Sequence, residues 1–75
     1  MMQPEDIKMM IEQGMPGAQV AVVGDGHHFE AQVVAQEFAG KGMLQRHQIV
    51  YRTLGSKMGN EIHALSLRTL APGEA

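Results

Sequence analysis

The chain has 75 residues, a formal net charge of −2 and no cysteine, which limits it to one small domain and excludes disulfide bonds, thiolate metal ligands and a cysteine nucleophile. The negative net charge gives no overall attraction to nucleic acid. No apolar run approaches the ~20 residues of a membrane span and no signal peptide is visible, so we expect a cytoplasmic protein without membrane contact.

The N-terminal part of the chain predicts a helix followed by a strand. The helix covers residues 4–13, with Pro4 at its first position and an apolar face that comprises Ile7, Met10 and Ile11. A valine-rich strand follows over residues 19–23. The glycines of residues 24–26 then indicate a hairpin turn into a second strand.

The second strand begins at His27 or His28 and runs to Ala35. Its apolar phase includes Phe29, which puts His27 on the core side of the sheet and His28 on the other side. Adjacent histidines beside a turn are either a metal half-site or solvated turn residues. The strand alone favours solvated turn residues.

The main helix is predicted over residues 43–58. It follows a flexible connection from which the Phe38 side chain is expected to pack into the core. One stripe of this helix is apolar, with Tyr51 beside it, and comprises Met43, His47, Val50, Leu54 and Met58. Between Phe38 and Asn60 the chain has four positive charges and no negative one, at Lys41, Arg46, Arg52 and Lys57. This basic surface is either a solvated face or a site for an acidic partner.

The last patterned segment, residues 61–68, predicts a half-buried strand. Leu65 and Leu67 share one side-chain phase, and His63 lies in the same phase where the strand begins. His63 is therefore expected on the core side but near the rim, either as a hydrogen-bonded core-edge residue or as a ligand that reaches a partner. From about residue 71 we expect a loose tail.

The order of elements, α-β-β-α-β, predicts an α+β fold. We expect a single small domain over residues 1–75, with a three-stranded mixed sheet and helices on one face. The hairpin pairs the first two strands antiparallel, and the helix between the second and third strands allows a parallel crossover. Those two strands then begin at one edge, where His27, His28 and His63 converge. Three imidazoles are too few for a closed metal site, which favours a site completed by another protein.

Several motifs, taken in order, resemble the BolA family and in particular its short IbaG-like branch. They are Gly24-Asp25-Gly26-His27-His28-Phe29, Phe38-Ala39-Gly40-Lys41, Leu44-Gln45-Arg46-His47, Val50-Tyr51 and Ile62-His63-Ala64-Leu65-Ser66-Leu67. The resemblance covers nearly the whole chain, and its most specific part is the combination of Arg46-His47 with Ile62-His63-Ala64-Leu65. It implies a fold like a class II KH domain, with a short extra helical turn before the main helix.

For function, the resemblance implies a partner of monothiol glutaredoxins. Together the two proteins would hold a [2Fe-2S] cluster, with ligands from the glutaredoxin cysteine, from glutathione and from the BolA-like protein, which binds no cofactor alone. The C-terminal histidine ligand of the family falls on His63. The second ligand lies in the loop between the first two strands, where both His27 and His28 are available. Storage, transfer and sensing of the cluster all stay open, as does a homodimer.

The competing interpretation is a nucleic-acid-binding regulator. A KH-like fold and the basic residues of the main helix allow contact with DNA. The family often has Arg-His-Arg in this helix, whereas this chain has Arg46-His47-Gln48 and one positive charge fewer. The chain also lacks the Gly-x-x-Gly loop of KH domains, and Tyr51 is expected on the buried side. We do not expect an enzyme, because no nucleophile–base pair or carboxylate pair can be placed together.

Overall fold

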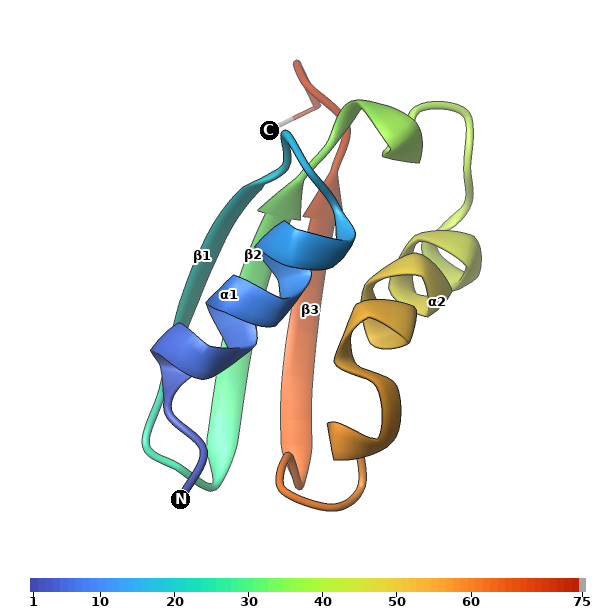
Figure 1. Cartoon of the computed structure of the whole chain (residues 1–75). Coiled ribbons are helices and arrows are strands. Elements are labelled where there is room, and N and C mark those ends of the chain that lie inside the picture. Colours follow the sequence, from blue (N-terminus) through green and yellow to red (C-terminus); the bar gives the residue numbers. More distant parts are fainter. Residues whose placement is uncertain (75) are drawn as a thin grey trace.

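The computed structural model describes residues 1–74, which form two α-helices, two 3-10 turns and three strands (Figure 1). In chain order they are α1 (Pro4–Gly14), β1 (Gln19–Gly24), β2 (His28–Val34), η1 (Gln36–Phe38), α2 (Met43–Leu54), η2 (Gly55–Lys57) and β3 (Ala64–Leu70). The predicted order α-β-β-α-β is confirmed, and η1 is the short helical turn expected before the main helix. No helix within residues 1–74 is long and apolar enough to cross a bilayer.

The three strands form one mixed sheet in the order β1-β2-β3. β1 pairs antiparallel with β2, so that Gly24 stands opposite Phe29. β2 pairs parallel with β3, so that His28 stands opposite Ala64. The predicted pairing is therefore confirmed, and β2 and β3 begin at the same edge of the sheet.

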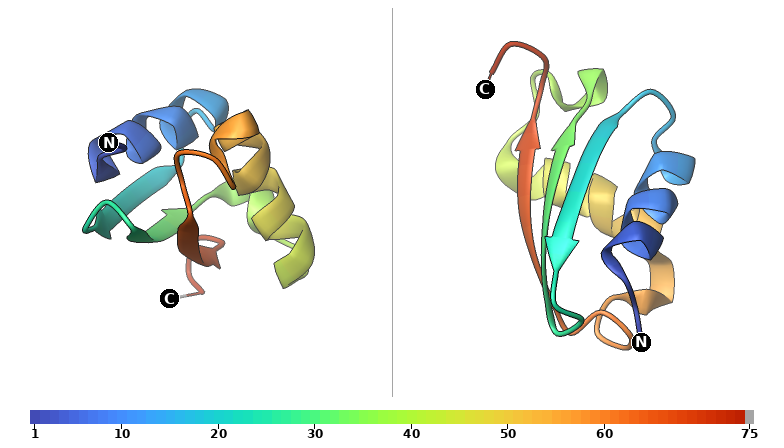
Figure 2. Two further views of the ribbon diagram at one scale, coloured as in Figure 1. Left: turned by 90° about the horizontal axis from the view of Figure 1, so that it is seen from below. Right: turned by 90° about the vertical axis from the view of Figure 1, so that its left-hand side faces the viewer.

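Both helices cover one face of the sheet, and the other face is open (Figure 2). The side chains of β2 that point toward the helices are buried, and those that point away are exposed except for Val34, which is half-buried. On β3, Leu65 and Leu67 share the covered face because they stand opposite Phe29 and Ala31 of β2. The alternation read from the sequence is correct along both strands.

A single hydrophobic core joins the helices to the sheet. Its largest side chains come from every layer and are almost completely buried: Ile7, Ile11, Phe29, Val33, Phe38, Val50, Leu54 and Ile62. Each such side chain stabilises the fold by ~1.5–3 kcal/mol relative to an exposed position. Phe38 is 0% exposed and fills the core from η1, as predicted.

The main helix is shorter than predicted and packs through a narrower face. α2 ends at Leu54, because Gly55 adopts φ 55° and starts η2. Met43 is 73% exposed, since it lies two turns before Val50 in a part of the helix that buries no side chain. Tyr51 is 37% exposed rather than on the buried side, because it lies about 100° around the helix axis from Val50.

The last strand begins later than predicted. The N–H of Ile62 donates to the Lys57 carbonyl at 2.9 Å, and the N–H of Gly59 donates to the Ile62 carbonyl at 2.9 Å. These bonds close a turn that buries Ile62 and leaves His63 exposed, outside β3. The last strand is therefore predicted to start too early, and His63 lies at its rim as an exposed residue rather than inside the half-buried strand.

The C-terminal residues differ from the expected loose tail. Ala71 is 5% exposed, and the N–H of Glu74 donates to the Ala71 carbonyl at 3.1 Å. The Glu74 side chain forms an ion pair with Arg46 of α2. Ala71 is therefore part of the core, and residues 72–74 form an exposed turn held by the Arg46–Glu74 pair.

Candidate functional site

The turn between β1 and β2 fixes the backbone of the histidine pair. The Asp25 carboxylate accepts hydrogen bonds from the N–H groups of His27 and His28, both at 2.9 Å. The bond from His28, and then that from His27, hold the pKa of Asp25 below its usual value. Gly26 adopts φ 97°, a conformation that favours glycine. The sequence folds here into a tight turn that presents two adjacent imidazoles.

The two histidines of this turn differ in their surroundings. His28 is the first residue of β2 and lies in the exposed phase of that strand, as predicted. His27 lies in the turn before the strand and is also exposed. β2 thus begins at His28, the later of the two predicted starts, and His27 is an exposed turn residue directly before it.

His27 and His63 line one surface hollow at the edge where β2 and β3 begin. The hollow has a volume of about 460 Å³, and its other lining residues are Met1, Met2, Asp6, Gly26 and Glu61. Figure 1 shows the N-terminus, the hairpin turn and the loop before β3 at this same end of the molecule. The structure thus brings His27 and His63 to one place and leaves His28 outside the lining of the hollow.

The carboxylates of the hollow are engaged by other groups. Asp6 accepts a hydrogen bond from the N–H of Gln3 at 2.9 Å. Glu61 pairs with Lys57 at 2.7 Å, and this bond lowers the pKa of Glu61. Within residues 1–74, no three His, Asp or Glu side chains lie close enough to hold a metal ion together. The hollow therefore offers two exposed imidazoles but no closed metal site.

Two of the four predicted basic residues form ion pairs. Nη1 and Nη2 of Arg46 lie 2.6 and 2.9 Å from the two carboxylate oxygens of Glu74, and Lys57 pairs with Glu61. Neither pair follows from the sequence pattern, because the acidic partners come after Asn60, outside the basic segment. The positive surface of this segment is accordingly weaker than the sequence indicates.

The other two basic residues, Lys41 and Arg52, are exposed and line one shallow hollow beside α2. The Lys41 ammonium donates to the Glu37 carbonyl at 2.5 Å. Glu37 also lines this hollow, together with Gln45 and Gln48. The positive charge on this side of α2 is thus limited to two side chains near one carboxylate.

Comparisons with known proteins agree on the family. A family model described as BolA-like protein matches residues 3–74. The structure of a bolA protein homologue from Coxiella burnetii is similar, with a TM-score of 0.87, 49% identity and coverage of 96% of this chain and 94% of that one.

Two curated relatives are longer than this chain. The DNA-binding transcriptional regulator BolA of Vibrio cholerae is 36% identical over 72 residues, which are 96% of this chain and 65% of that protein. BolA-like protein 1 of Homo sapiens is 31% identical over 71 residues, which are 95% of this chain and 50% of that protein. The chain therefore spans between half and two thirds of these two relatives.

Proposed function

Because the chain belongs to the family of BolA-like proteins, we propose that it lends histidine ligands to a [2Fe-2S] cluster held by a monothiol glutaredoxin. The glutaredoxin cysteine and glutathione supply the thiolates, His63 supplies one nitrogen and His27 supplies the second. The observation that carries this proposal is the shared hollow of His27 and His63, which come from separate loops and are both exposed.

The donor groups of the hollow suit a shared cluster. Cysteine thiolates hold most iron–sulfur clusters, and histidines replace two cysteines on one iron of Rieske centres. This chain has no cysteine, so it can offer imidazole nitrogen while its partner provides sulfur. The cluster itself supplies the redox chemistry and the visible absorption of the complex.

The surroundings of the two imidazoles suit contact with a partner. Met1 and Met2 lie in the same hollow and give it flexible apolar surface. The Asp25 turn and the Ile62 turn each hold the backbone beside one histidine. The backbone beside each histidine is thus fixed in the free protein, which would lower the entropic cost of binding a partner there.

The choice of His27 over His28 as second ligand also rests on position. His27 lines the hollow with His63, whereas His28 begins β2 in the exposed phase of the strand. A partner that approaches His63 therefore meets His27 first. His28 becomes the matched control, because it is also exposed and is the next residue in the chain.

The test is to mix the protein with a cluster-loaded monothiol glutaredoxin and record visible absorption and circular dichroism. Complex formation is measured separately by size-exclusion chromatography. We expect His63→Ala and His27→Ala to change the spectrum of the complex, and His28→Ala to match the unmodified protein. If His63→Ala gives a complex with an unaltered spectrum, the ligand assignment is wrong.

A second candidate function, binding to nucleic acid, is favoured by Lys41 and Arg52, which line one exposed hollow. The Vibrio cholerae relative is also named a DNA-binding transcriptional regulator. Binding of a duplex oligonucleotide should then weaken with salt, and Lys41→Gln or Arg52→Gln should lower the salt slope by about one unit each. Absence of binding at low salt would remove this candidate.

A further inference from the structure

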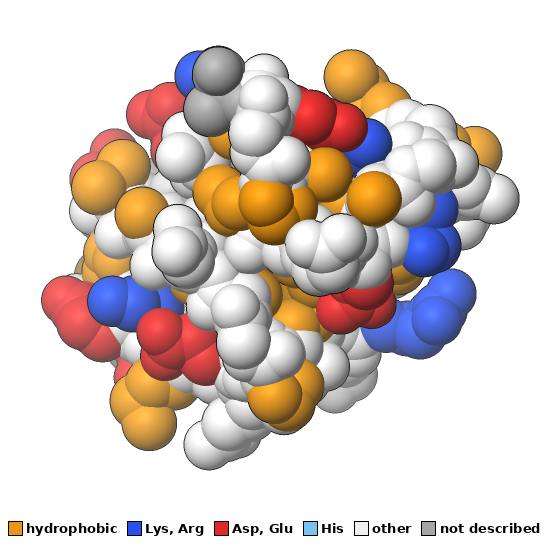
Figure 3. Space-filling view, turned by 90° about the horizontal axis from the view of Figure 1, so that it is seen from above, with side chains coloured by type: hydrophobic (Ala, Val, Ile, Leu, Met, Phe, Trp, Pro, Cys, Tyr) orange, Lys and Arg blue, Asp and Glu red, His pale blue; other side chains and the backbone are white. Residues whose placement is uncertain are grey.

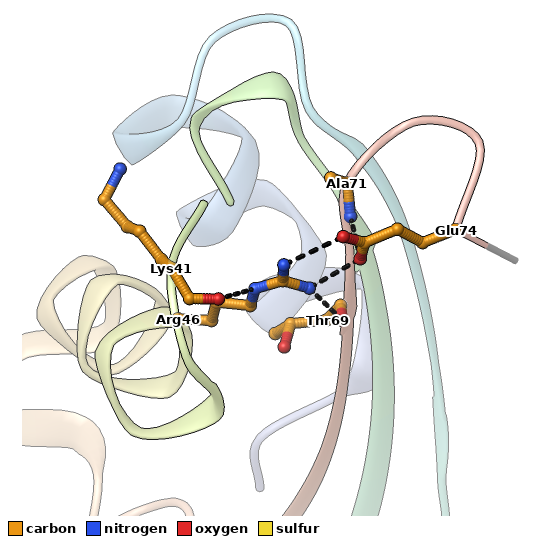
Figure 4. Close-up of polar contacts among 5 residues, drawn as sticks. All are labelled: Lys41, Arg46, Thr69, Ala71 and Glu74. Atoms are coloured by element: carbon orange, nitrogen blue, oxygen red, sulfur yellow. Dashed lines mark hydrogen bonds and ion pairs between the residues drawn. The ribbon is translucent and has the colours of Figure 1, made fainter. Parts of the chain in front are cut away.

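The Arg46 side chain is held by several contacts near the end of β3 (Figure 4), whereas His27 and His63 directly precede β2 and β3 at the other end of the sheet. Its Nε donates to the Lys41 carbonyl at 2.8 Å, and its Nη1 donates to the Thr69 carbonyl at 3.3 Å. The guanidinium carbon also lies 5.9 Å from the centre of the Phe38 ring, within the range of a cation–π contact. None of these contacts involves an anion, so the guanidinium is oriented whether or not an anion is bound.

Glu74 occupies the open side of this guanidinium. Its two oxygens accept from Nη1 at 2.6 Å and from Nη2 at 2.9 Å, and Oε1 also accepts from the N–H of Ala71 at 2.9 Å. A bidentate arginine beside a backbone N–H is a donor set that binds carboxylate and phosphate groups. The bond from Arg46, followed by that from Ala71, lowers the pKa of Glu74 to about 2.

The two partners of this ion pair are not equally fixed. The Arg46 side chain is 13% exposed, whereas that of Glu74 is 41% exposed. Glu74 follows Pro72 and Gly73, and Gly73 adopts φ 88° on an exposed turn. Glu74 can therefore leave without unpacking the core, while the donors stay in place.

From this asymmetry we propose that Arg46 and the Ala71 N–H form an oxyanion-binding site in which Glu74 is a replaceable internal ligand. A carboxylate or phosphate group of a partner molecule takes its place. Figure 3 views the molecule from this end, and acidic and basic side chains lie next to one another on it. The site lies far from the hollow of His27 and His63 and does not depend on the proposed cluster function.

The test is a titration of the whole chain with inorganic phosphate, and separately with acetate, followed by ¹H–¹⁵N NMR. The reporters are the Ala71 N–H and the Arg46 Nε–H. We expect Glu74→Ala to bind at least about tenfold more tightly than the unmodified protein, because an internal ligand raises the apparent Kd by the inverse of the open fraction. If the affinity of Glu74→Ala rises for phosphate alone or for acetate alone, that anion is the preferred group. If it rises for both, the site binds oxyanions in general.

Two controls separate the site from a general effect of charge. Glu12→Ala on α1 removes the same negative charge elsewhere and should leave the affinity unchanged. Arg46→Lys in the Glu74→Ala background keeps the positive charge but cannot donate two parallel hydrogen bonds to one anion. This double variant should therefore bind the anion no more tightly than the unmodified protein. The proposal is overturned if Glu74→Ala binds the anions no more tightly than the unmodified protein, or if Glu12→Ala gives an equal rise in affinity. It is also overturned if the chemical-shift changes in Glu74→Ala do not include Ala71 and Arg46.

Discussion

At the scale of single residues, the position of His63 follows from the burial of its neighbour. Ile62 is 0% exposed, and its N–H is bonded to the Lys57 carbonyl. The chain then enters β3 at Ala64, so His63 is left on the surface beside Glu61 and His27. The buried Ile62 thus fixes the backbone beside His63 without burying the imidazole.

This arrangement predicts opposite effects for two adjacent substitutions. Ile62→Ala should lower the free energy of unfolding by about 2–5 kcal/mol, because it leaves a cavity in the core. His63→Ala should change it by less than about 0.5 kcal/mol, because the side chain is exposed. Urea denaturation measures both, and a large loss for His63→Ala would show that this histidine serves the fold.

The Arg46–Glu74 pair predicts a dependence of stability on pH. The pKa of Glu74 is lowered from 4.5 to about 2, so the pair contributes its full stability above the ordinary pKa. This contribution is lost as the pH falls through the window between the two values. The difference in unfolding free energy between the unmodified protein and Glu74→Gln should therefore shrink from pH 4.5 down to about 2. A difference that grows in this window would contradict the pairing.

At the scale of elements, α2 packs through its second half. Leu54 is 2% exposed and Leu44 is 72% exposed, although both are leucines of the same helix. Val50 is the other buried residue of α2. Residues 43–45 of the first turn thus lie beyond the contact of the helix with the core and are exposed.

The two leucines give a matched comparison. Leu54→Ala should cost about 2–5 kcal/mol of unfolding free energy, and Leu44→Ala should change it by less than about 0.5 kcal/mol. Because the helix and the substitution are the same, helix propensity cancels. Equal losses in thermal or urea denaturation would show that the buried face of α2 is wrongly assigned.

The sequence predicts the order, pairing and faces of these elements because each rests on a repeating pattern. Leu65 and Leu67 repeat with period two, and Ile7 and Ile11 repeat with the period of a helix. The end of α2 and the start of β3 could not be predicted, because they depend on the conformation of Gly55 and on the backbone bonds of Gly59 and Ile62. The spacing of apolar side chains does not predict a turn of this kind.

At the scale of the whole molecule, the parallel pairing of β2 with β3 separates two polar sites. His27 and His63 directly precede these strands, and Arg46 donates to the Thr69 carbonyl near the end of β3. The closeness of the histidines could be predicted, since parallel strands start at one edge. The Arg46–Glu74 pair could not, because it joins residues from two elements without any shared pattern.

The central claim is that this chain supplies imidazole nitrogen to the cluster of a partner. The direct measurement is pulsed electron paramagnetic resonance of the reduced complex, with ¹⁵N-labelled histidine in this chain only. We predict ¹⁵N couplings from this chain that are weaker in His63→Ala and in His27→Ala and unchanged in His28→Ala. A reduced complex that shows no ¹⁵N coupling from this chain would contradict the claim.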